Sequence, residues 1–331
     1  AYMANLVDGL DVASGGELSV ALTTNTSPRD ISFAGPGKQE WELEAAINAG
    51  ITVNVESISE VQRLAKIAET TGNRANIAVR VNPSFELKTA GMKMGGRPSP
   101  FGIDAEQVPT VLDNIKSLDL NFRGFHIFSG SQNLREQAII EALQKTVDLV
   151  IELSATADHA IEFVNLGGGL GIPYFPAEKP IDLRELGDSF ETAVNRLESE
   201  LSKPEIIMEL GRYLVGEAGI YVCRVIDVKE SRGKVFAICD GGLHHHLAAS
   251  GNFGQVIRKN YPVCAVKRKE KCQEISIVGP LCTPLDLLAN QINLSQLIPG
   301  DLVAVLQSGA YGKSASPARF LSHPECLEVL I

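Results

Sequence analysis

Ile161-Glu162-Phe163-Val164-Asn165-Leu166-Gly167-Gly168-Gly169 is the stretch of this sequence that decides the fold. Its first six residues form a short, mainly apolar run of the kind that makes a buried β-strand, and three glycines follow it. Because glycine has no side chain, consecutive backbone N–H groups can close around an anion, and phosphate is the anion we expect. Glycines after a strand also make ordinary tight turns, so this interpretation needs support from the rest of the chain.

Six more segments of the same kind lie between residues 9 and 215. With the glycine strand, the predicted strands cover residues 10–13, 31–34, 51–55, 77–81, 122–127, 161–166 and 206–210. Amphipathic helical patterns separate them, and the clearest places Ile139, Leu143, Val147, Val150 and Ile151 on one face. Strict alternation of strands and helices predicts a parallel sheet with helices outside it.

Seven such units are one short of the eight that close a (β/α)8 TIM-type barrel. We therefore expect an α/β fold of this type whose first βα unit is absent from the chain, which indicates N-terminal truncation. After about residue 220 the helical patterns stop, and strands are predicted at residues 220–228, 234–239, 275–278 and 302–306. The predicted organisation is a barrel over residues 1–220 and an all-β domain, sandwich-like or barrel-like, over residues 221–331.

Composition argues against several classes of partner. A formal charge of −10 repels nucleic acid and anionic lipid surfaces, and no stretch is long and apolar enough to cross a bilayer. The six cysteines form no C-x-x-C pair, so we expect reduced thiols. The first residues lack a basic leader and a cleavage site, and the expected location is therefore the cytoplasm.

Residues at the carboxyl ends of barrel strands face the mouth where barrel enzymes do their chemistry. Polar and glycine residues gather at these predicted positions: Asp11, Arg80, His126, Ser129, Gly167, Gly168, Gly169, Glu209 and Arg212. Arg212 would give an acidic protein the local positive charge that a phosphate needs. The sequence therefore predicts a phosphate site surrounded by titratable groups.

Motifs in a fixed order along the whole chain carry a resemblance to a known family. They are Gly9-Leu10-Asp11-Val12-Ala13-Ser14, Val79-Arg80-Val81-Asn82-Pro83, Gly124-Phe125-His126 with Ser129, the triple glycine, Glu209-Leu210-Gly211-Arg212-Tyr213, Gly279-Pro280-Leu281-Cys282 and Gly309-Ala310-Tyr311-Gly312. Together they resemble the fold-type III pyridoxal-phosphate-dependent decarboxylases, which include the diaminopimelate, ornithine and arginine enzymes. Residues 244–254 are similar to the subgroup found in siderophore, aminoglycoside and exosortase gene clusters.

The resemblance implies a carboxy-lyase that uses pyridoxal 5'-phosphate and acts on an amino acid or an amino-acid conjugate. Glu209 would face the pyridine nitrogen and keep the ring protonated, so that the ring can accept the electrons left by departing carbon dioxide. An ordinary ion pair with Arg212 is the alternative for this carboxylate. His126 would stack on the ring, although a lone histidine on an apolar strand is more often a core residue.

The resemblance also implies which residues hold the rest of the cofactor. The phosphate would be bound by Gly167, Gly168, Gly169, Ser129, Gly211 and Arg212, with Tyr311 closing the cup. Asp11 and Arg80 would orient the cofactor or its neighbours, or would serve as structural ion-pair partners.

Cys282 is placed by the family at the active site of the partner subunit, where its thiol can return a proton to the substrate carbon. Shared sites of this kind require a homodimer; an inert cysteine is the alternative. Thr283 stands where the diamino-acid decarboxylases have an acidic residue for the distal amine of the substrate. Because a hydroxyl cannot form an ion pair, we expect a substrate with a neutral or anionic far end near Thr283 and Tyr311, and diaminopimelate is the alternative.

The lysine that carries the cofactor in this family belongs to a strand upstream of the first residue of this chain. Neither Lys38 nor Lys93 is assigned that role, and we expect the chain alone to be inactive. His244, His245 and His246 could suggest a metal, but neighbours in an extended strand point to opposite faces, so at most two could converge, and we predict no metal.

Two other functions remain open from the sequence. A racemase of related architecture is disfavoured, because alanine-type racemases present arginine to the ring nitrogen where this chain has Glu209. A non-catalytic homologue that acts through protein contacts is the second alternative.

Overall fold

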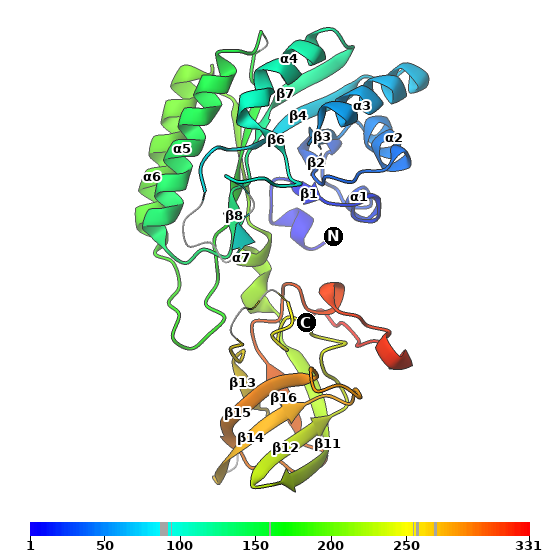
Figure 1. The fold of residues 1–331 in the computed structure, drawn as a ribbon, viewed down its shortest axis with the longest axis vertical. Coiled ribbons are helices and arrows are strands. Elements are labelled where there is room, and N and C mark those ends of the chain that lie inside the picture. Colours follow the sequence, from blue (N-terminus) through cyan, green and yellow to red (C-terminus); the bar gives the residue numbers. More distant parts are fainter. Residues whose placement is uncertain (87–91, 94, 159, 254, 256–257, 268–269) are drawn as a thin grey trace. The chain divides into compact units, whose positions relative to one another are not determined.

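A computed structural model describes residues 1–86, 92–93, 95–158, 160–253, 255, 258–267 and 270–331 (Figure 1). The chain divides into two compact units: Ala1–Gly171 with Ile181–Leu210, and Ile172–Pro180 with Gly211–Ile331. The sequence-based domain boundary at residue 220 stays a prediction. Among the described residues, no helix is long and apolar enough to cross a bilayer.

The first unit is built on a curved parallel sheet with the strand order β1-β2-β3-β4-β7-β9-β10. Its strands are β1 (Leu10–Val12), β2 (Ile31–Phe33), β3 (Thr52–Val55), β4 (Ala75–Asn82), β7 (Leu120–His126), β9 (Phe163–Gly168) and β10 (Glu205–Glu209). The short strand β6 (Ile103–Asp104) pairs with the end of β4, while β5 (Met92–Lys93) and β8 (Gly130–Ser131) pair with each other. All seven predicted strands are confirmed, and the sheet forms a nearly closed barrel.

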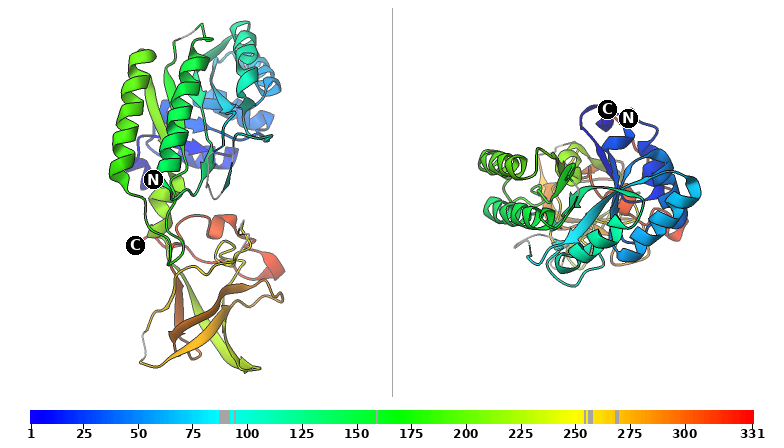
Figure 2. Two further views of the ribbon diagram at one scale, coloured as in Figure 1. Left: turned by 60° about the vertical axis from the view of Figure 1, so that its left-hand side comes forward. Right: turned by 90° about the horizontal axis from the view of Figure 1, so that it is seen from above.

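Helices follow these strands and cover the outer side of the sheet (Figure 1). They are α1 (Gly15–Ala21), α2 (Glu40–Ala49), α3 (Ile58–Thr71), α4 (Val108–Lys116), α5 (Glu136–Ser154) and α6 (Leu183–Glu200). Ser57 caps α3 by accepting a hydrogen bond from Glu60 N, and Gly72 ends that helix in the left-handed conformation (φ 72°). Helices α5 and α6 lie side by side (Figure 2).

The core of the first unit lies where the strands and helices share apolar side chains. Every residue of β3 is buried, and so are nearly all residues of β4. Parallel strands covered on both faces need such continuous burial, which explains why these segments were recognisable as apolar runs. Burying these side chains is the main driving force for folding of this unit.

The second unit holds a six-stranded sheet with the order β13-β16-β11-β12-β14-β15. The strands are β11 (Tyr221–Ser231), β12 (Lys234–Cys239), β13 (Val263–Ala265), β14 (Cys272–Val278), β15 (Leu287–Ser295) and β16 (Leu302–Val305), preceded by the short helix α7 (Gly211–Val215). The four predicted strands are confirmed, and β13 and β15 are additional.

Single 3-10 turns occur in both units, at Met3–Asn5, Pro28–Asp30, Ala105–Gln107, Gly216–Ala218, Lys313–Ala315 and Phe320–Ser322.

Gly124 sets the spacing between β7 and β9. It is paired in register with Phe163, and a Cβ atom at position 124 would overlap the carbonyl oxygen of Phe163. We expect Gly124→Ala to lower the free energy of unfolding by about 1–3 kcal/mol, the usual cost of overpacking. Urea unfolding followed by circular dichroism measures this change.

Gly187 provides the matched control, because a Cβ atom there, on α6, meets no atom within 4 Å. Gly187→Ala should raise stability by up to about 1 kcal/mol through helix propensity. Equal stability of Gly124→Ala and the unmodified protein would contradict the tight contact between β7 and β9.

Candidate active site

Three adjacent strands of the first unit bring His126, Asn165 and Glu209 together. His126 ends β7 and is paired in register with Asn165 of β9, while Glu209 ends β10 beside Gly168. Oε1 of Glu209 lies 3.1 Å from Nε2 of His126 and accepts a hydrogen bond of 2.7 Å from Nδ2 of Asn165. Glu209 and His126, each predicted as a site residue, are therefore in direct contact, with Asn165 as a third member.

Glu209 is held in its ionised form. Burial is the largest single effect and raises the pKa of this carboxyl, but His126, the hydrogen bond from Asn165 and the charge of Arg80 together outweigh burial, so the pKa lies below its ordinary value. Oε2 of Glu209 has no hydrogen-bond partner among the described residues, and the side chain is 17% exposed. Both ring nitrogens of His126 are buried without a hydrogen bond of proper geometry.

Asp11 on β1 behaves in the opposite way. The surrounding protein, and after it the charge of Glu209, raise the pKa of Asp11 well above its usual range, against a hydrogen bond of 2.5 Å from Ser32 Oγ. Asp11 is nevertheless exposed, so it lines a part of the barrel that water reaches. Two carboxyl groups whose pKa values move apart are typical of an acid–base site.

Arg80 and Lys38 are engaged in buried ion pairs. Nη1 of Arg80 lies 2.7 Å from Oε1 of Glu56, and Lys38 Nζ lies 2.9 Å from Oε1 of Glu60 while donating to two backbone carbonyls. Glu56 also accepts hydrogen bonds from Gly35 N, just after β2, and from Gly102 N, just before β6. These contacts support the alternative in which Arg80 is a structural ion-pair partner. The side chain of Lys93 lies outside the described residues.

The triple glycine forms the last two residues of β9 and the residue after them, and the chain changes direction there at two left-handed residues, Gly167 (φ 69°) and Gly169 (φ 94°); we call this segment the glycine turn. A Cβ atom on Gly168 would overlap the carbonyl oxygen of Glu209, so β9 and β10 also need a glycine for packing. The N–H of Gly167 is already donated to Oδ1 of Asn165 at 2.8 Å. The carbonyl oxygen of Gly169 accepts a hydrogen bond from Asn133 N at 2.9 Å.

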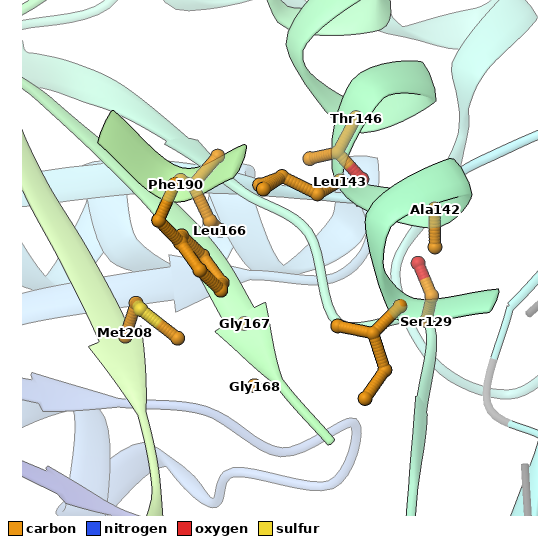
Figure 3. A pocket seen from close by; sticks show the side chains of 10 residues that line it. Ser129, Ala142, Leu143, Thr146, Leu166, Gly167, Gly168, Phe190 and Met208 are labelled. Carbon is orange, nitrogen blue, oxygen red and sulfur yellow. The ribbon is translucent and has the colours of Figure 1, made fainter. Parts of the chain in front are cut away.

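Ser129 and the glycines line a narrow cavity (Figure 3). Leu143 of α5, Phe190 of α6 and Met208 of β10 form its apolar walls. Because side chains alternate along a strand, Met208 faces the helices whereas its neighbour Glu209 faces the barrel interior. The structure therefore brings Ser129 to Gly167 and Gly168 on the helix side of the sheet.

In the second unit, Arg212 of α7 lies against two tyrosines. Its guanidinium carbon is 4.4 Å from the ring centre of Tyr311, and Nη1 donates a 3.0 Å hydrogen bond to Tyr174 Oη. Nε of Arg212 is buried and has no hydrogen-bond partner. Gly211, the first residue of α7, is exposed.

Cys282 and Thr283 belong to a loop that Asp286 holds in place. The buried carboxylate of Asp286 accepts hydrogen bonds from Leu281 N (2.8 Å) and Leu243 N (2.6 Å). Cys282 is exposed and Thr283 is half-buried on this loop. The thiol is therefore accessible, as a proton donor must be.

The prediction that His244, His245 and His246 lie in an extended strand is wrong. They occupy a turn, in which the N–H groups of His245 and His246 both donate to Gly242 O. Burial lowers the pKa of His246 to about 4. Its Nδ1 accepts from Ala249 N, so Nε2 donates to Ser308 Oγ at 2.9 Å, three residues before Tyr311. Of the segment at residues 244–254, Gly254 lies outside the described residues.

Sequence reasoning missed Asn165, Glu56 and Asp286. The only sequence signal for Asn165 was a polar residue in an apolar strand, at a position that faces into the barrel. The partners of Glu56 and Asp286 are remote in sequence, and nothing in the local pattern indicated them.

A nearly closed parallel barrel with an ionised glutamate, a histidine and a glycine turn at its strand ends defines a barrel enzyme with a site for an anionic cofactor. Residues 1–216 match the family described as pyridoxal-dependent decarboxylase, pyridoxal binding domain. This chain therefore belongs to the pyridoxal-dependent decarboxylases, and it is a carboxy-lyase whose cofactor is pyridoxal phosphate.

Individual relatives agree with this assignment. The chain is 40% identical to the L-glutamyl-[BtrI acyl-carrier protein] decarboxylase of Niallia circulans, over 97% of this chain and 77% of the relative. It is 32% identical to the 2-[(L-alanin-3-ylcarbamoyl)methyl]-2-hydroxybutanedioate decarboxylase of Staphylococcus aureus, over 96% and 80%. Diaminopimelate decarboxylase from M. jannaschii has a similar structure, with a TM-score of 0.88 and 31% identity over 97% of this chain and 74% of that one.

The raised pKa of Asp11 predicts a pH-dependent gain in stability for Asp11→Asn. The folded protein binds this proton more tightly than the unfolded chain does, so ionisation of Asp11 destabilises the fold as the pH rises. We expect Asp11→Asn to melt at a higher temperature than the unmodified protein at about pH 7, with the difference shrinking towards about pH 4. Thermal unfolding across this pH range measures it.

Asp8→Asn is the control, because it removes another exposed carboxylate of the same segment, just before β1. It should show no such pH-dependent difference. A lower melting temperature of Asp11→Asn at neutral pH would contradict the raised pKa.

Proposed function

We propose that this enzyme decarboxylates an amino acid or amino-acid conjugate whose far end carries a negative charge, and that it works as a homodimer in the cytoplasm. The observation that carries the proposal is the ionised Glu209, whose Oε2 is free beside His126. A carboxylate in this state suits a protonated ring nitrogen, since the ion pair favours the pyridinium form.

The described residues fit pyridoxal phosphate, which supplies an acceptor for the electrons left by departing carbon dioxide when it is bound. Glu209 would accept the hydrogen of the ring nitrogen and His126 would cover the ring face. The N–H groups of Gly168 and Gly169, with Ser129, would bind phosphate oxygens. Arg212 and Tyr311 follow in the second unit, where Arg212 would contribute positive charge and Tyr311 a hydroxyl.

Cys282 would return a proton to the substrate carbon after carbon dioxide leaves. Its exposure, on a loop fixed by Asp286, supports access from a second subunit. The homodimer follows from this shared use of the thiol.

Two residues of the second unit support an anionic far end of the substrate. Thr283 offers a hydroxyl, which does not attract an ammonium group as a carboxylate would. Arg258 carries a guanidinium whose Nε and Nη2 are buried without a hydrogen-bond partner, and burial alone lowers its pKa. An unpaired buried cation attracts an anion.

Arg258 belongs to the same group of loops as Thr283. The Arg258 side chain lies against the turn at Gly251, and the next residue, Asn252, donates to Leu285 O at 3.2 Å. Phe253 of this turn is 5.7 Å, centre to centre, from the ring of Tyr311. The substrate named for the Staphylococcus aureus relative is a hydroxybutanedioate, which is itself anionic.

Absorbance of pyridoxal phosphate bound to the full-length protein, followed by carbon dioxide release from a panel of amino acids, tests the reaction. We expect Glu209→Gln to bind the cofactor within a few-fold of the unmodified protein and to release carbon dioxide about 100-fold more slowly or worse, because its amide cannot stabilise the charged ring. Glu205→Gln, at the opposite end of β10, is the control. A Glu209→Gln enzyme with full activity would remove the role assigned to this carboxylate.

Arg258→Leu tests the substrate class. We expect it to raise KM for amino acids with a carboxylate or acylated far end by about tenfold or more, since a charged hydrogen bond contributes about 1.5–3 kcal/mol. Cofactor affinity should not change, and Arg224→Leu, an exposed arginine on β11, should leave KM as it is. An unchanged KM in Arg258→Leu, or faster turnover of free diamino acids, contradicts the proposal.

A further inference from the structure

Asn165 connects two parts of the proposed cofactor site through one side chain. Its Nδ2 donates to Oε1 of Glu209 at 2.7 Å, and its Oδ1 accepts from Gly167 N at 2.8 Å. Asn165 itself is 1% exposed. We propose that Asn165 is a positioning residue that fixes the carboxylate for the ring nitrogen relative to the glycine turn for the phosphate; this rests on the proposed function.

The direction of both hydrogen bonds is determined by their partners. The backbone N–H of Gly167 can only donate, so the atom of Asn165 that faces it must be the amide oxygen. The amide NH2 group is thereby turned towards Glu209. Because an NH2 group can only donate, Oε1 of Glu209 must accept and cannot carry a proton. Asn165 thus favours the ionised form of Glu209, because a carboxylate oxygen is a stronger acceptor than the oxygen of a carboxylic acid.

Burial makes the two bonds depend on each other. If either bond is lost, a buried amide atom is left without a partner. This lowers the stability of the fold more than the loss of an exposed hydrogen bond does. Glu209 and Gly167 are therefore held at a fixed separation by an amide and by the pairing of β9 with β10. A rigid cofactor with a ring nitrogen at one end and a phosphate at the other needs such a fixed separation.

A purely structural asparagine would affect stability without changing the chemistry of the site. Asn121 serves as this comparison, because its amide donates to Asn76 Oδ1 at 2.8 Å between β7 and β4, at the amino ends of the same sheet. Asn121→Leu removes a hydrogen bond between side chains of neighbouring strands, as Asn165→Leu does, but it touches neither Glu209 nor the glycine turn.

Asn165→Asp distinguishes the role of Asn165 as a donor to Glu209 from its role as an acceptor from Gly167 N. When its new carboxyl is protonated, one oxygen accepts from Gly167 N and the O–H donates to Glu209, as the amide does. When that proton leaves, two carboxylates face each other and repel. The other charged groups near this pair are His126 of β7, Arg80 of β4 and Asp11 of β1, and they are the same in both proteins.

The experiment measures the dissociation constant of pyridoxal phosphate by absorbance from about pH 5 to pH 9, the range over which facing carboxylates give up a shared proton. Binding by the unmodified protein is measured first, and its absence would end the proposed function without testing Asn165. We expect Asn165→Leu to weaken binding about tenfold or more at every pH, and Asn121→Leu to bind within twofold.

For Asn165→Asp, the dissociation constant divided by that of the unmodified protein should start near one at low pH and rise about tenfold as the second proton leaves. Circular dichroism spectra recorded alongside confirm that each variant is folded. The proposal is overturned if Asn165→Leu binds as tightly as the unmodified protein, or if the ratio for Asn165→Asp does not change with pH.

Discussion

The ionised carboxylate of Glu209 inside the barrel is the feature on which the rest of the site depends. Burial opposes that charge, and the fold offsets the cost with Asn165 on the neighbouring strand β9 and His126 on β7, the strand beyond it. Pairing of β7 with β9 places His126 opposite Asn165, and a register irregularity between Ile207 and Glu209 of β10 sets Glu209 beside Gly168, within reach of both. Register, which is a property of the backbone, thus fixes the electrostatics of a side chain.

The same barrel mouth carries polar groups that do not favour folding by themselves. Ion pairs of Lys38 with Glu60 and of Arg80 with Glu56 are buried, and such pairs stabilise a fold little once desolvation is counted. Asn54 of β3 is buried with both amide atoms unpaired. These costly polar groups lie together at one end of an apolar barrel. This indicates that the barrel end gives up some stability for function.

The strands of the first unit were predictable because strands covered on both faces read as continuous apolar runs. The strand β15 was not, since Asn290, Gln291 and Asn293 interrupt its apolar pattern. Arg80 was correctly placed at a strand end, but its partner Glu56 is 24 positions away, and the pairing of β3 with β4 brings the two together. The histidine run was taken as extended because residue type alone does not show that Gly242 begins a turn there.

In the second unit, buried polar side chains hold two loops to which we assign functions. The hydrogen bonds of each of these side chains allow it only one orientation. Asp286 accepts backbone hydrogens and so fixes the loop of Cys282, while the neutral His246 donates to Ser308 and fixes the approach to Tyr311. Neither group would contact substrate. Thr283 and Arg258, which we propose to face the substrate, lie on or against these fixed loops. Because different side chains set the loop positions and the specificity, a change of substrate needs no change of scaffold.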